Sequence, residues 1–428
     1  MISEPLRTWA GNHTYPAEVV HRPGGLAHLQ DIVAGSRRVR AVGSRHCFND
    51  LVDSTALVSL EAMPAVLELD EDRRTVRVDA AVRYGVLAEA LHGRGWALHN
   101  LASLPHISVA GAVATATHGS GDGSSNLASA VAGLEIVGAD GQLLRLTRAD
   151  PELAGAVVGL GALGIVTALT LDVEPTYDVV QQVHTGLPWQ VVLDDLDAVT
   201  GSADSVSLFT DWRGPLVAQV WRKHRIAGGT LPPGPWELGE AAGASAARRQ
   251  VHPLPGGDPG STTAQLGVPG PWYERLPHFR MGFVPSAGQE LQSEYLVARS
   301  HAVAALSAVR RLAGLLAPVL LVSEIRTVAA DDLWLSMAYR RDSLALHFTW
   351  ALRPGAVAAL LPVLEEALAP FSPRPHWGKL FTSAVGYPCG ADFRSLVSRL
   401  DPEGTFGNAF LDRHVFSVPD ERPAPVRG

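Results

Sequence analysis

The sequence predicts an α+β fold with two domains and a shorter C-terminal segment. Its 428 residues correspond to two or three domains at about 150 residues each. Up to residue 175, short β-like runs alternate with glycine-rich turns, and this sequence pattern changes after Glu174-Pro175. Strands and two long amphipathic helices follow, which is typical of an α+β domain. We therefore expect one domain over 1–175, a second over 176–370, and a segment over 371–428 that packs back on the first domain.

The elements of the first domain follow from short hydrophobic patterns. Runs of Val, Leu and Ile predict strands, and apolar residues at helical spacing predict helices that end near glycine. In chain order we expect a strand at 39–42, a hairpin at 66–78, a helix at 84–92, a hairpin at 134–146, a helix at 151–158 and a strand at 165–173.

In the second domain, longer periodic segments are interrupted by one stretch of loop-like composition. We expect several short strands between 182 and 222, an amphipathic helix at 298–315, strands at 319–327 and 347–352, and a helix at 357–368. Residues 227–270 are rich in Gly, Pro, Ala and Ser, and they predict a long surface excursion or mobile loop.

Composition excludes several classes of protein. With 46% hydrophobic and 18% charged residues, the chain can bury a sizeable core, which excludes intrinsic disorder. The net charge of −8 argues against nucleic-acid partners, which require clustered cations. The longest apolar run, 312–322, contains Pro318 and is shorter than the roughly 20 residues that span a bilayer, so we expect no membrane partner. The N-terminus lacks a secretory pattern and the cysteines are only two, so we expect a cytoplasmic protein, and we also expect a monomer.

Most catalytic sequence motifs are absent. The chain has no GK[ST] phosphate loop, no HExxH, no CxxC and no G-x-S-x-G, and its 16 histidines lack metal-ligand spacing, so we expect no metal. Gly159–Gly164 matches G-x-G-x-x-G, but a predicted helix precedes it and a strand follows, the reverse of the dinucleotide-binding order. We interpret it as a helix end leading into a strand, while contact with a cofactor of another kind stays open.

Lysine is rare enough to be informative. Of the 35 basic residues, 33 are arginine, and Lys223 and Lys379 are the two lysines. Because arginine serves here for generic charge, a retained lysine indicates a need for a compact charge whose pKa can move.

A turn directly after the first predicted strand is the first positive signal. It reads Gly43-Ser44-Arg45-His46-Cys47-Phe48-Asn49. Glycine and serine in such a turn leave several backbone N–H groups free to bind a pyrophosphate. The neutral ring of His46 is a competent nucleophile toward an electrophilic cofactor carbon. The alternative is an ordinary turn with an incidental histidine.

A run of small residues over 104–121 is the second signal. It reads LPHISVAGAVATATHGSG, and it contains too few large side chains for the core of a helix or strand. Such a run suits backbone that passes close to a large planar ligand. The alternative is a coding bias toward Gly and Ala.

Polar residues late in the chain are the third signal. Glu324 and Arg326 lie two apart on one predicted strand, and His347 and Thr349 lie two apart on another. Residues at that spacing share a face, so two strands and Lys379 could present an acid, a guanidinium, an imidazole, a hydroxyl and an amine to one cavity. The alternative is a solvated sheet face with a salt bridge.

Taken together, these motifs resemble the vanillyl-alcohol-oxidase-type flavoproteins and, among them, the alditol (xylitol) oxidases. The resemblance extends over nearly the whole chain. It is carried by Trp9–Asn12, GSRHCFN at 43–49, the run from Asn100 to Gly121, VGLGALGIVT at 158–167, VSLFTDWR at 206–213, LGVPGPWYERLPHFR at 266–280, LQSEYL at 291–296, EIRTVAAD at 324–331, HFTW at 347–350, RPHWGK at 374–379 and Phe406–Phe410.

The resemblance implies a two-part FAD-binding domain of the vanillyl-alcohol-oxidase type (PCMH type) and an α+β substrate domain with an antiparallel sheet. It implies FAD bound covalently through His46 and the flavin 8α-methyl group. The implied reaction is oxidation of the terminal C1 hydroxyl of alditols such as xylitol and sorbitol to the aldose, by hydride transfer to flavin N5, with O2 reduced to hydrogen peroxide. Alternatives are an aldonolactone oxidase or dehydrogenase of the same superfamily, or a non-catalytic flavin- or sugar-binding protein.

The resemblance also assigns site residues. Ser103, Glu324, Arg326, Thr349 and Lys379 are expected to bind substrate, and Lys379, Arg326, His347 and Glu324 to act in catalysis. The residues expected to contact the cofactor are Ala41, Val42, Gly43, Ser44, Arg45, His46, Cys47, Ser103, Ser108, Ala110, Gly111, Ala114, Thr115, Thr117, His118, Gly119, Gly161, Gly164, Ile165, Val166, His376 and Lys379. Arg45 and Cys47 stand where the alditol oxidases usually have small residues.

Overall fold

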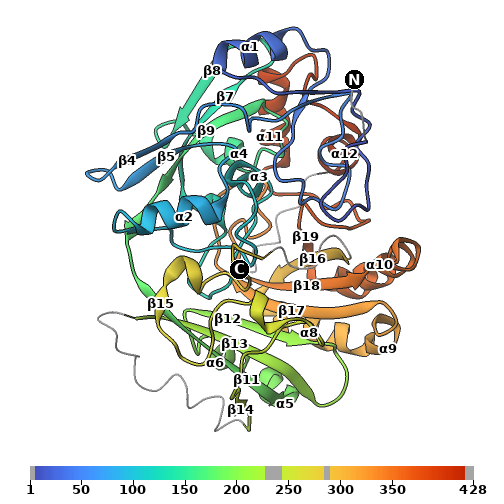
Figure 1. Ribbon diagram of the computed structural model, residues 1–428. Helices are drawn as coiled ribbons and strands as arrows, with labels where there is room; N and C mark the ends of the chain where they lie inside the picture. The colour runs from blue at the N-terminus through green and yellow to red at the C-terminus, as the bar shows by residue number, and fades with distance from the viewer. Residues whose placement is uncertain (1–4, 227–242, 284–289, 420–428) are drawn as a thin grey trace, which may run out of the picture.

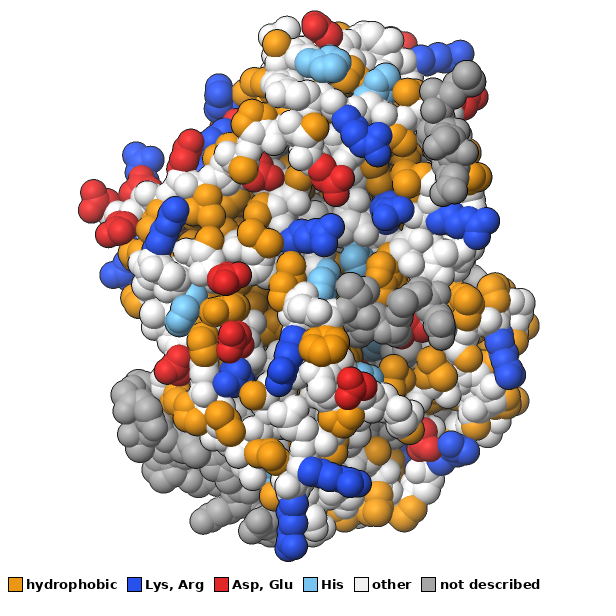
Figure 2. Space-filling view, viewed as in Figure 1, with side chains coloured by type: hydrophobic (Ala, Val, Ile, Leu, Met, Phe, Trp, Pro, Cys, Tyr) orange, Lys and Arg blue, Asp and Glu red, His pale blue; other side chains and the backbone are white. Residues whose placement is uncertain are grey.

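The computed structural model describes residues 5–226, 243–283 and 290–419. Figure 1 shows the elements of the first 175 residues in the upper half and a large sheet in the lower half, with α11 and α12 of the C-terminal segment returning to the upper half. On the face drawn in Figure 2, acidic and basic side chains are interspersed, and histidines lie near the junction of the two halves.

Two sheets form the framework of the N-terminal part. A parallel three-stranded sheet has the order β1-β3-β2, and an antiparallel five-stranded sheet has the order β4-β5-β9-β7-β8. Both predicted hairpins and the predicted helix at 84–92 are confirmed. The bounds are β1 Val19–His21, α1 Leu26–Ala34, β2 Arg40–Ala41, β3 Ala56–Val58, β4 Leu67–Asp70, β5 Thr75–Asp79, α2 Tyr84–His92, β6 Trp96–Ala97, α3 Val109–Ala114, η1 Leu127–Ala130, β7 Val131–Val137, β8 Leu143–Thr147, α4 Leu153–Val157, β9 Ile165–Asp172 and β10 Glu174–Pro175.

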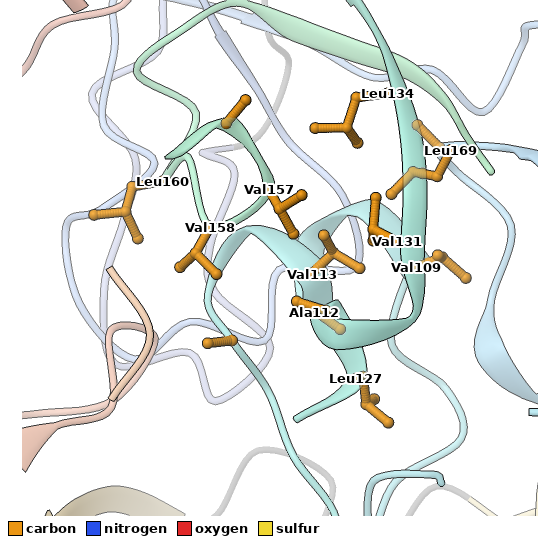
Figure 3. Packing of buried hydrophobic residues seen from close by; sticks show 14 of the residues in the cluster. Val109, Ala112, Val113, Leu127, Val131, Leu134, Val157, Val158, Leu160 and Leu169 are labelled. Atoms are coloured by element: carbon orange, nitrogen blue, oxygen red, sulfur yellow. The ribbon is translucent and has the colours of Figure 1, made fainter. Parts of the chain in front are cut away.

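The short helix α3 corrects the expectation that 104–121 is too poor in large side chains to form a helix. One face of α3 packs Val109, Ala112 and Val113 into the core beside Leu134 and Leu169 (Figure 3). The small residues Ala110, Gly111 and Ala114 lie on its other face. Small side chains therefore do not prevent a helix here; they let it sit close to a cavity on one side.

A nine-stranded antiparallel sheet forms the second part. Its strand order is β14-β11-β13-β12-β17-β18-β16-β19, and β15 pairs with β11. The bounds are β11 Asp178–Pro188, β12 Ser205–Thr210, β13 Leu216–Ile226, β14 Ser245–Ala246, β15 Gly270–Pro271, β16 Glu290–Ala298, β17 Leu320–Val328, β18 Ser343–Ala351 and β19 Arg374–Pro375. Between 182 and 222 the sequence predicted several short strands, but β11 and β13 each have 11 residues and form one long hairpin-like pair.

Helices cover one face of this sheet. Leu306 of α8 (Ala302–Arg311) and Leu364 of α10 (Pro354–Leu368) pack with Ile325, Leu346 and Phe348 of the strands. The remaining helices of this layer are α5 Trp189–Asp194, α6 Leu196–Thr200 and α9 Ala313–Leu316. The single helix predicted at 298–315 is broken, because a 3-10 turn at Arg299–His301 precedes α8 and Leu312 separates α8 from α9.

One helical stretch, Pro354–Phe371, is long and apolar enough by length and composition to cross a membrane. Its buried side packs into the core of the sheet, and Glu365 is buried within it, where it accepts a hydrogen bond from Tyr295 at 2.8 Å. These contacts are those of a core helix in a globular domain.

The glycine- and proline-rich stretch was predicted as a surface excursion, and residues 227–242 of it lie outside the described residues. The described part is instead packed against the sheet: β14 pairs with β11, and Thr262, Thr263 and Gln265 are buried. The amide of Gln265 hydrogen-bonds both the N–H and the carbonyl of Val251 at 3.0 and 2.8 Å. Side-chain amides thus replace the hydrogen bonds that a regular element would provide.

The C-terminal segment contacts both parts. β19 joins the nine-stranded sheet, whereas Phe406 and Phe410 lie in the core of the N-terminal part. Arg399 forms an ion pair with Glu152 at 2.5 Å. The bounds here are α11 Gly390–Leu400, α12 Ala409–Leu411 and one π-helical turn at Asp412–Phe416.

Candidate active site

A cavity of about 340 Å³ lies between the N-terminal part and the nine-stranded sheet. The turn after β2, one face of α3 and the 159–166 loop form one wall. The facing wall comes from β16, β17 and β18, and the segment 376–379 closes one side. Elements more than 300 residues apart in sequence therefore meet at one site.

The turn after β2 is held tightly against the start of α3. Ser44 Oγ accepts a hydrogen bond from the backbone N–H of Ser108 at 3.1 Å. A Cβ added at Gly43 would lie 2.5 Å from Ser108 Oγ, so a side chain there would force the turn away from α3. Arg45 takes a positive φ of 61°, which bends the chain so that His46 lines the cavity. The turn is therefore shaped as a backbone cradle.

His46 faces the cavity as a neutral ring. It stacks on Trp9 with ring centroids 5.2 Å apart and an interplanar angle of 20°. Its Nδ1 is buried and has no hydrogen-bond partner among the described residues. Burial, aided by His106, lowers the pKa of His46 to about 4, and burial raises the pKa of the neighbouring Cys47 thiol to about 11. An uncharged imidazole, whose buried Nδ1 has no partner among the described residues, is thus part of the cavity lining.

Most residues predicted to contact a cofactor do line the cavity. They are Ala41, Val42, Gly43, Ser44, Arg45, His46, Cys47, Ser103, Ser108, Ala110, Gly111, Ala114, Thr115, Thr117, His118, Gly161, Gly164, Val166, His376 and Lys379.

Gly119 and Ile165 do not line the cavity, which corrects two predicted contacts. Ile165 and Val166 are successive residues of β9, so they point to opposite faces; Val166 lines the cavity, and Ile165 is fully buried in the core. A Cβ at Gly119 would lie 2.4 Å from the Leu101 carbonyl oxygen. Gly119 therefore serves close chain packing beside the site.

The strand register places five polar residues on the face of the sheet opposite the helices. Glu324 of β17 and Glu294 of β16 both lie directly opposite His347 of β18. Arg326 and Thr349 are two residues further along their strands and share that face. All of these side chains line the cavity.

Glu294 is the centre of the charge cluster, and sequence reasoning missed it. Its carboxylate accepts from Arg326 at 2.6 Å and from Lys379 at 2.7 Å, and its side chain is 1% exposed. Burial alone would raise the pKa of Glu294, but Lys379 and Arg326 hold it well below its ordinary value. The signal was present in the strand itself, because Glu290, Gln292 and Glu294 alternate on one face of β16.

Glu324 is bound by His278, which also lines the cavity and which sequence reasoning also missed. His278 Nε2 lies 2.8 Å from Glu324 Oε1, and Arg326 Nε lies 3.6 Å from the same oxygen. Burial opposes ionisation of Glu324, yet Arg326 and His278 lower its pKa far below the ordinary value. Glu324 is therefore a carboxylate that faces the cavity.

Two residues of β16 determine which nitrogen of His347 carries the proton. Gln292 Nε2 donates to Glu290 Oε1 at 2.6 Å, so Gln292 Oε1 is turned toward His347 Nε2 at 3.2 Å. An amide oxygen only accepts, so Nε2 carries the proton and Nδ1 keeps the lone pair. Burial and the charge of Lys379 lower the pKa of His347 to about 3, which keeps the ring neutral.

The turn after β2 and the C-terminal segment position Lys379 together. Asn49 Nδ2 donates to the carbonyls of Trp377 and Lys379, both at 2.8 Å, and Phe48 N donates to the Gly378 carbonyl at 2.8 Å. Burial lowers the pKa of Lys379, and Glu294 partly offsets that shift. Ser103 completes this end of the site, 3.4 Å from Arg326 Nη1.

Comparison with known proteins agrees with this two-part architecture. The family described as FAD binding domain matches residues 17–147, and the family described as D-arabinono-1,4-lactone oxidase matches residues 288–414. An alditol oxidase from Streptomyces sp. (strain IKD472) is 49% identical over 419 residues, covering 96% of this chain and 99% of that protein. The chain belongs to the alditol oxidase family.

More distant relatives share the fold of this alditol oxidase family member. An L-gulono-1,4-lactone dehydrogenase from Mycobacterium tuberculosis is 27% identical over 425 residues, covering 95% of this chain and 97% of that protein. The crystal structure of cholesterol oxidase from B. sterolicum matches with a TM-score of 0.73 at 13% identity, covering 96% of each chain. At that identity the likeness concerns the fold alone.

The residues of the first wall fit FAD. Among the described residues, the backbone N–H groups of 43–47 have no hydrogen-bond partner and are available to a pyrophosphate, the small residues Ala110, Gly111 and Ala114 of α3 line the cavity, and His46 is neutral with an unpartnered Nδ1. The N-terminal part of this alditol oxidase homologue is therefore an FAD-binding domain, and the chain is a flavin-dependent oxidoreductase that acts on CH–OH groups.

Proposed function

We propose that this protein oxidises the terminal C1 hydroxyl of alditols, such as xylitol and sorbitol, to the aldose, with O2 reduced to hydrogen peroxide. The observation that carries the proposal is the wall formed by Glu324, Arg326, His347 and Lys379, which faces the FAD-binding wall across one cavity. The identity to an alditol oxidase over nearly the full length supports the same reaction.

The wall suits a neutral, fully hydroxylated substrate. Each buried hydroxyl needs hydrogen-bond partners, because an unpaired polar group in a closed site is costly. Glu324 accepts hydrogen bonds, Arg326 and Lys379 donate them, and the hydroxyls of Ser103 and Thr349 do either. Positive and negative groups alternate along this wall, so an uncharged polyol is matched without leaving a net charge uncompensated.

The C1 hydroxyl must lose a proton as a hydride leaves C1. The Nδ1 lone pair of His347 is the proposed proton acceptor. Lys379 and Arg326 would stabilise the oxyanion that develops, a task worth roughly 3–4 kcal/mol per well-placed donor. FAD, when bound, supplies the acceptor for the hydride and passes the two electrons to O2.

We further propose that His46 binds the flavin covalently through its 8α-methyl group. A nucleophilic imidazole must be unprotonated and must have a free nitrogen, and His46 meets both conditions. A covalent link would tether the cofactor and raise its potential, which favours hydride acceptance. We also infer a cytoplasmic location, since Cys47 and Cys389 are free thiols, and we propose a monomer.

The second candidate is oxidation of an aldonolactone. It is favoured by the lactone oxidase family match over residues 288–414 and by the lactone dehydrogenase relative. An aldonolactone also carries hydroxyls that can donate to Glu324, so hydrogen bonding at Glu324 suits both substrates. The 49% identity to an alditol oxidase, against 27% to the lactone dehydrogenase, favours the alditol.

One experiment tests the proposal directly. The purified protein should be yellow, and xylitol added without oxygen should bleach the flavin band. A panel of alditols and aldonolactones, assayed for hydrogen peroxide, then ranks the two candidates. Bleaching by lactones but not by alditols would replace the proposal with the second candidate, and a yellow protein that bleaches with neither would indicate a non-catalytic flavin protein.

A further inference from the structure

Lys223, the other lysine of the chain, lies buried behind the site and has no part in the chemistry above. It is 2% exposed, on β13, directly opposite Ser205 of β12. Burial lowers its pKa to about 7, against a raising effect of Glu324. A buried cation at this depth must have its protons accepted by specific partners.

Three acceptors surround the ammonium group of Lys223. Its Nζ donates to the carbonyl oxygen of Leu276, to the carbonyl oxygen of Pro277 at 3.4 Å and to Nδ1 of His278 at 3.1 Å. An ammonium group has three protons, so all three are used. Because the Glu324 carboxylate oxygen 2.8 Å from Nε2 only accepts, the proton of the neutral ring must sit on Nε2, which leaves Nδ1 to accept from Lys223. Burial lowers the pKa of His278 to about 4, which keeps the ring neutral.

The orientation of His278 is fixed by its surroundings. Its ring meets Phe209 at 5.5 Å and 67° and Trp221 at 5.1 Å and 73°, both edge to face. Its backbone N–H donates to the Ser103 carbonyl at 3.1 Å. With the ring held in this way, Nε2–H points at Glu324 Oε1, 2.8 Å away.

This arrangement divides the two oxygens of Glu324 between protein and cavity. Oε1 receives His278 and faces Arg326, whereas Oε2 has no hydrogen bond within the described residues. We propose that Lys223 and His278 are positioning residues that keep Glu324 an acceptor-only carboxylate, with Oε2 reserved for a secondary hydroxyl of the alditol chain. The inference rests on the proposed function for its substrate, and it assigns the recognition of a polyhydroxylated chain, as opposed to a simple alcohol, to this triad.

The proposal differs from a purely structural role in a way that can be measured. If Lys223 and His278 only fill space, their loss lowers stability but does not change the ratio of KM for an alditol to KM for a short diol. If they orient Glu324, their loss raises KM for alditols with several hydroxyls and changes KM much less for a short diol that does not reach Glu324.

The variants are His278→Gln, His278→Leu and Lys223→Met, in the flavin-loaded enzyme. Glutamine can accept from Lys223 and donate to Glu324, whereas leucine can do neither. We expect His278→Leu and Lys223→Met to raise KM for xylitol about tenfold to a hundredfold, the range for one charge-assisted hydrogen bond. His278→Gln should stay within about threefold of the wild type. Equal losses for His278→Gln and His278→Leu would overturn the proposal.

Arg222→Met is the matched control. Arg222 is the neighbouring residue of β13 and is also a buried cation, 2% exposed, but it lies on the opposite face of the strand. Its loss should lower the melting temperature without raising the ratio of KM for xylitol to KM for a short diol that has no secondary hydroxyl, such as 1,3-propanediol. A raised ratio in this control would show that any buried cation of β13 has the same effect, and would overturn the proposal.

Ring-15N NMR of histidine gives a readout independent of turnover. The His278 signals, assigned by their loss in His278→Gln, should show Nε2 protonated and Nδ1 accepting. The Nδ1-protonated tautomer would refute the assignment even in a fully active enzyme. Conversely, a protein that oxidises lactones and not alditols, yet shows the expected tautomer, would refute the proposed function and leave the orientation of Glu324 established.

Discussion

Asn49 and Lys379, 330 residues apart in sequence, are joined by a hydrogen bond of 2.8 Å from the Asn49 side chain to the Lys379 carbonyl. The same amide nitrogen donates to the Trp377 carbonyl at 2.8 Å. The turn that cradles the cofactor thereby also fixes the backbone that carries the lysine of the facing wall. A single amide group couples cofactor binding to the position of a catalytic side chain.

Asn49→Ala should therefore affect catalysis more than cofactor content. Loss of the two bonds should lower the free energy of unfolding by about 2 kcal/mol, at about 1 kcal/mol for each, and should lower kcat about tenfold as Lys379 moves. Flavin absorbance per chain, urea unfolding and kcat for xylitol measure the three effects. Gln30→Ala is the control, since the Gln30 amide donates to the Gly141 carbonyl at 2.7 Å and neither residue lines the cavity; an equal loss of kcat in both variants would contradict the coupling.

His46→Ala should release the flavin from the chain. After acid precipitation, we expect the yellow colour to remain with the wild-type pellet and to appear in the supernatant of the variant. His13→Ala is a matched control, because His13 is a partly exposed histidine that pairs with Asp53 outside the cavity. If the colour stays with the His46→Ala pellet, the covalent link lies at another residue.

The sequence predicted the site in outline because its periodicities are local. Glu324 with Arg326, and His347 with Thr349, could be placed on shared strand faces from their spacing alone. Glu294 could not be recognised in this way, since its role depends on β16 lying on the far side of β18, and strand order is not a local property. His278 was missed for the same reason, because it comes from a segment without regular structure.

The small-residue run shows a second limit of local reasoning. Composition correctly suggested that 104–121 comes close to a large ligand-sized cavity, but it gave no sign that Val109–Ala114 would be helical. Valines at 109 and 113 are four apart and supply the single buried stripe that the helix needs, while tertiary packing overrides the low content of large side chains. The break between α8 and α9 at Leu312 was likewise not evident from the amphipathic pattern of 298–315.

Lys379→Met should lower turnover far more than it lowers flavin content. The substitution removes a cation that faces the cavity and keeps most of the side-chain volume, so the FAD-binding wall is undisturbed. We expect kcat to fall by at least about a hundredfold, in line with about 3 kcal/mol for one well-placed charge. Flavin content from the visible spectrum and kcat for xylitol test this, and unaltered turnover would remove Lys379 from the catalytic group.

Glu294→Gln should be the most destabilising single change at the site. It leaves the buried cations Arg326 and Lys379 without their shared counter-charge, and breaking such a buried pair costs about 3–5 kcal/mol. The double variant Glu294→Gln, Lys379→Met should recover part of that loss, because one unpaired cation is then absent. Urea unfolding of the wild type, both single variants and the double variant gives the interaction energy, and strictly additive losses would show that the two charges are not coupled.

Acid should destabilise the protein through its buried neutral histidines. Burial lowers the pKa of His278 to about 4 and, together with Lys379, the pKa of His347 to about 3, whereas histidines of the unfolded chain titrate near 6.5. Their contribution to stability is complete above pH 6.5 and is lost as the pH falls toward these folded values, since the unfolded chain then binds protons that the folded rings exclude. Each such histidine should contribute up to about 1.4 kcal/mol of lost stability per pH unit. Urea unfolding between pH 7.5 and 5 measures how steeply the free energy of unfolding falls as the pH is lowered. The His278→Gln variant has one such histidine fewer, so its free energy of unfolding should fall less steeply by about that amount. Parallel slopes in the two proteins would mean that His278 is protonated in the folded state.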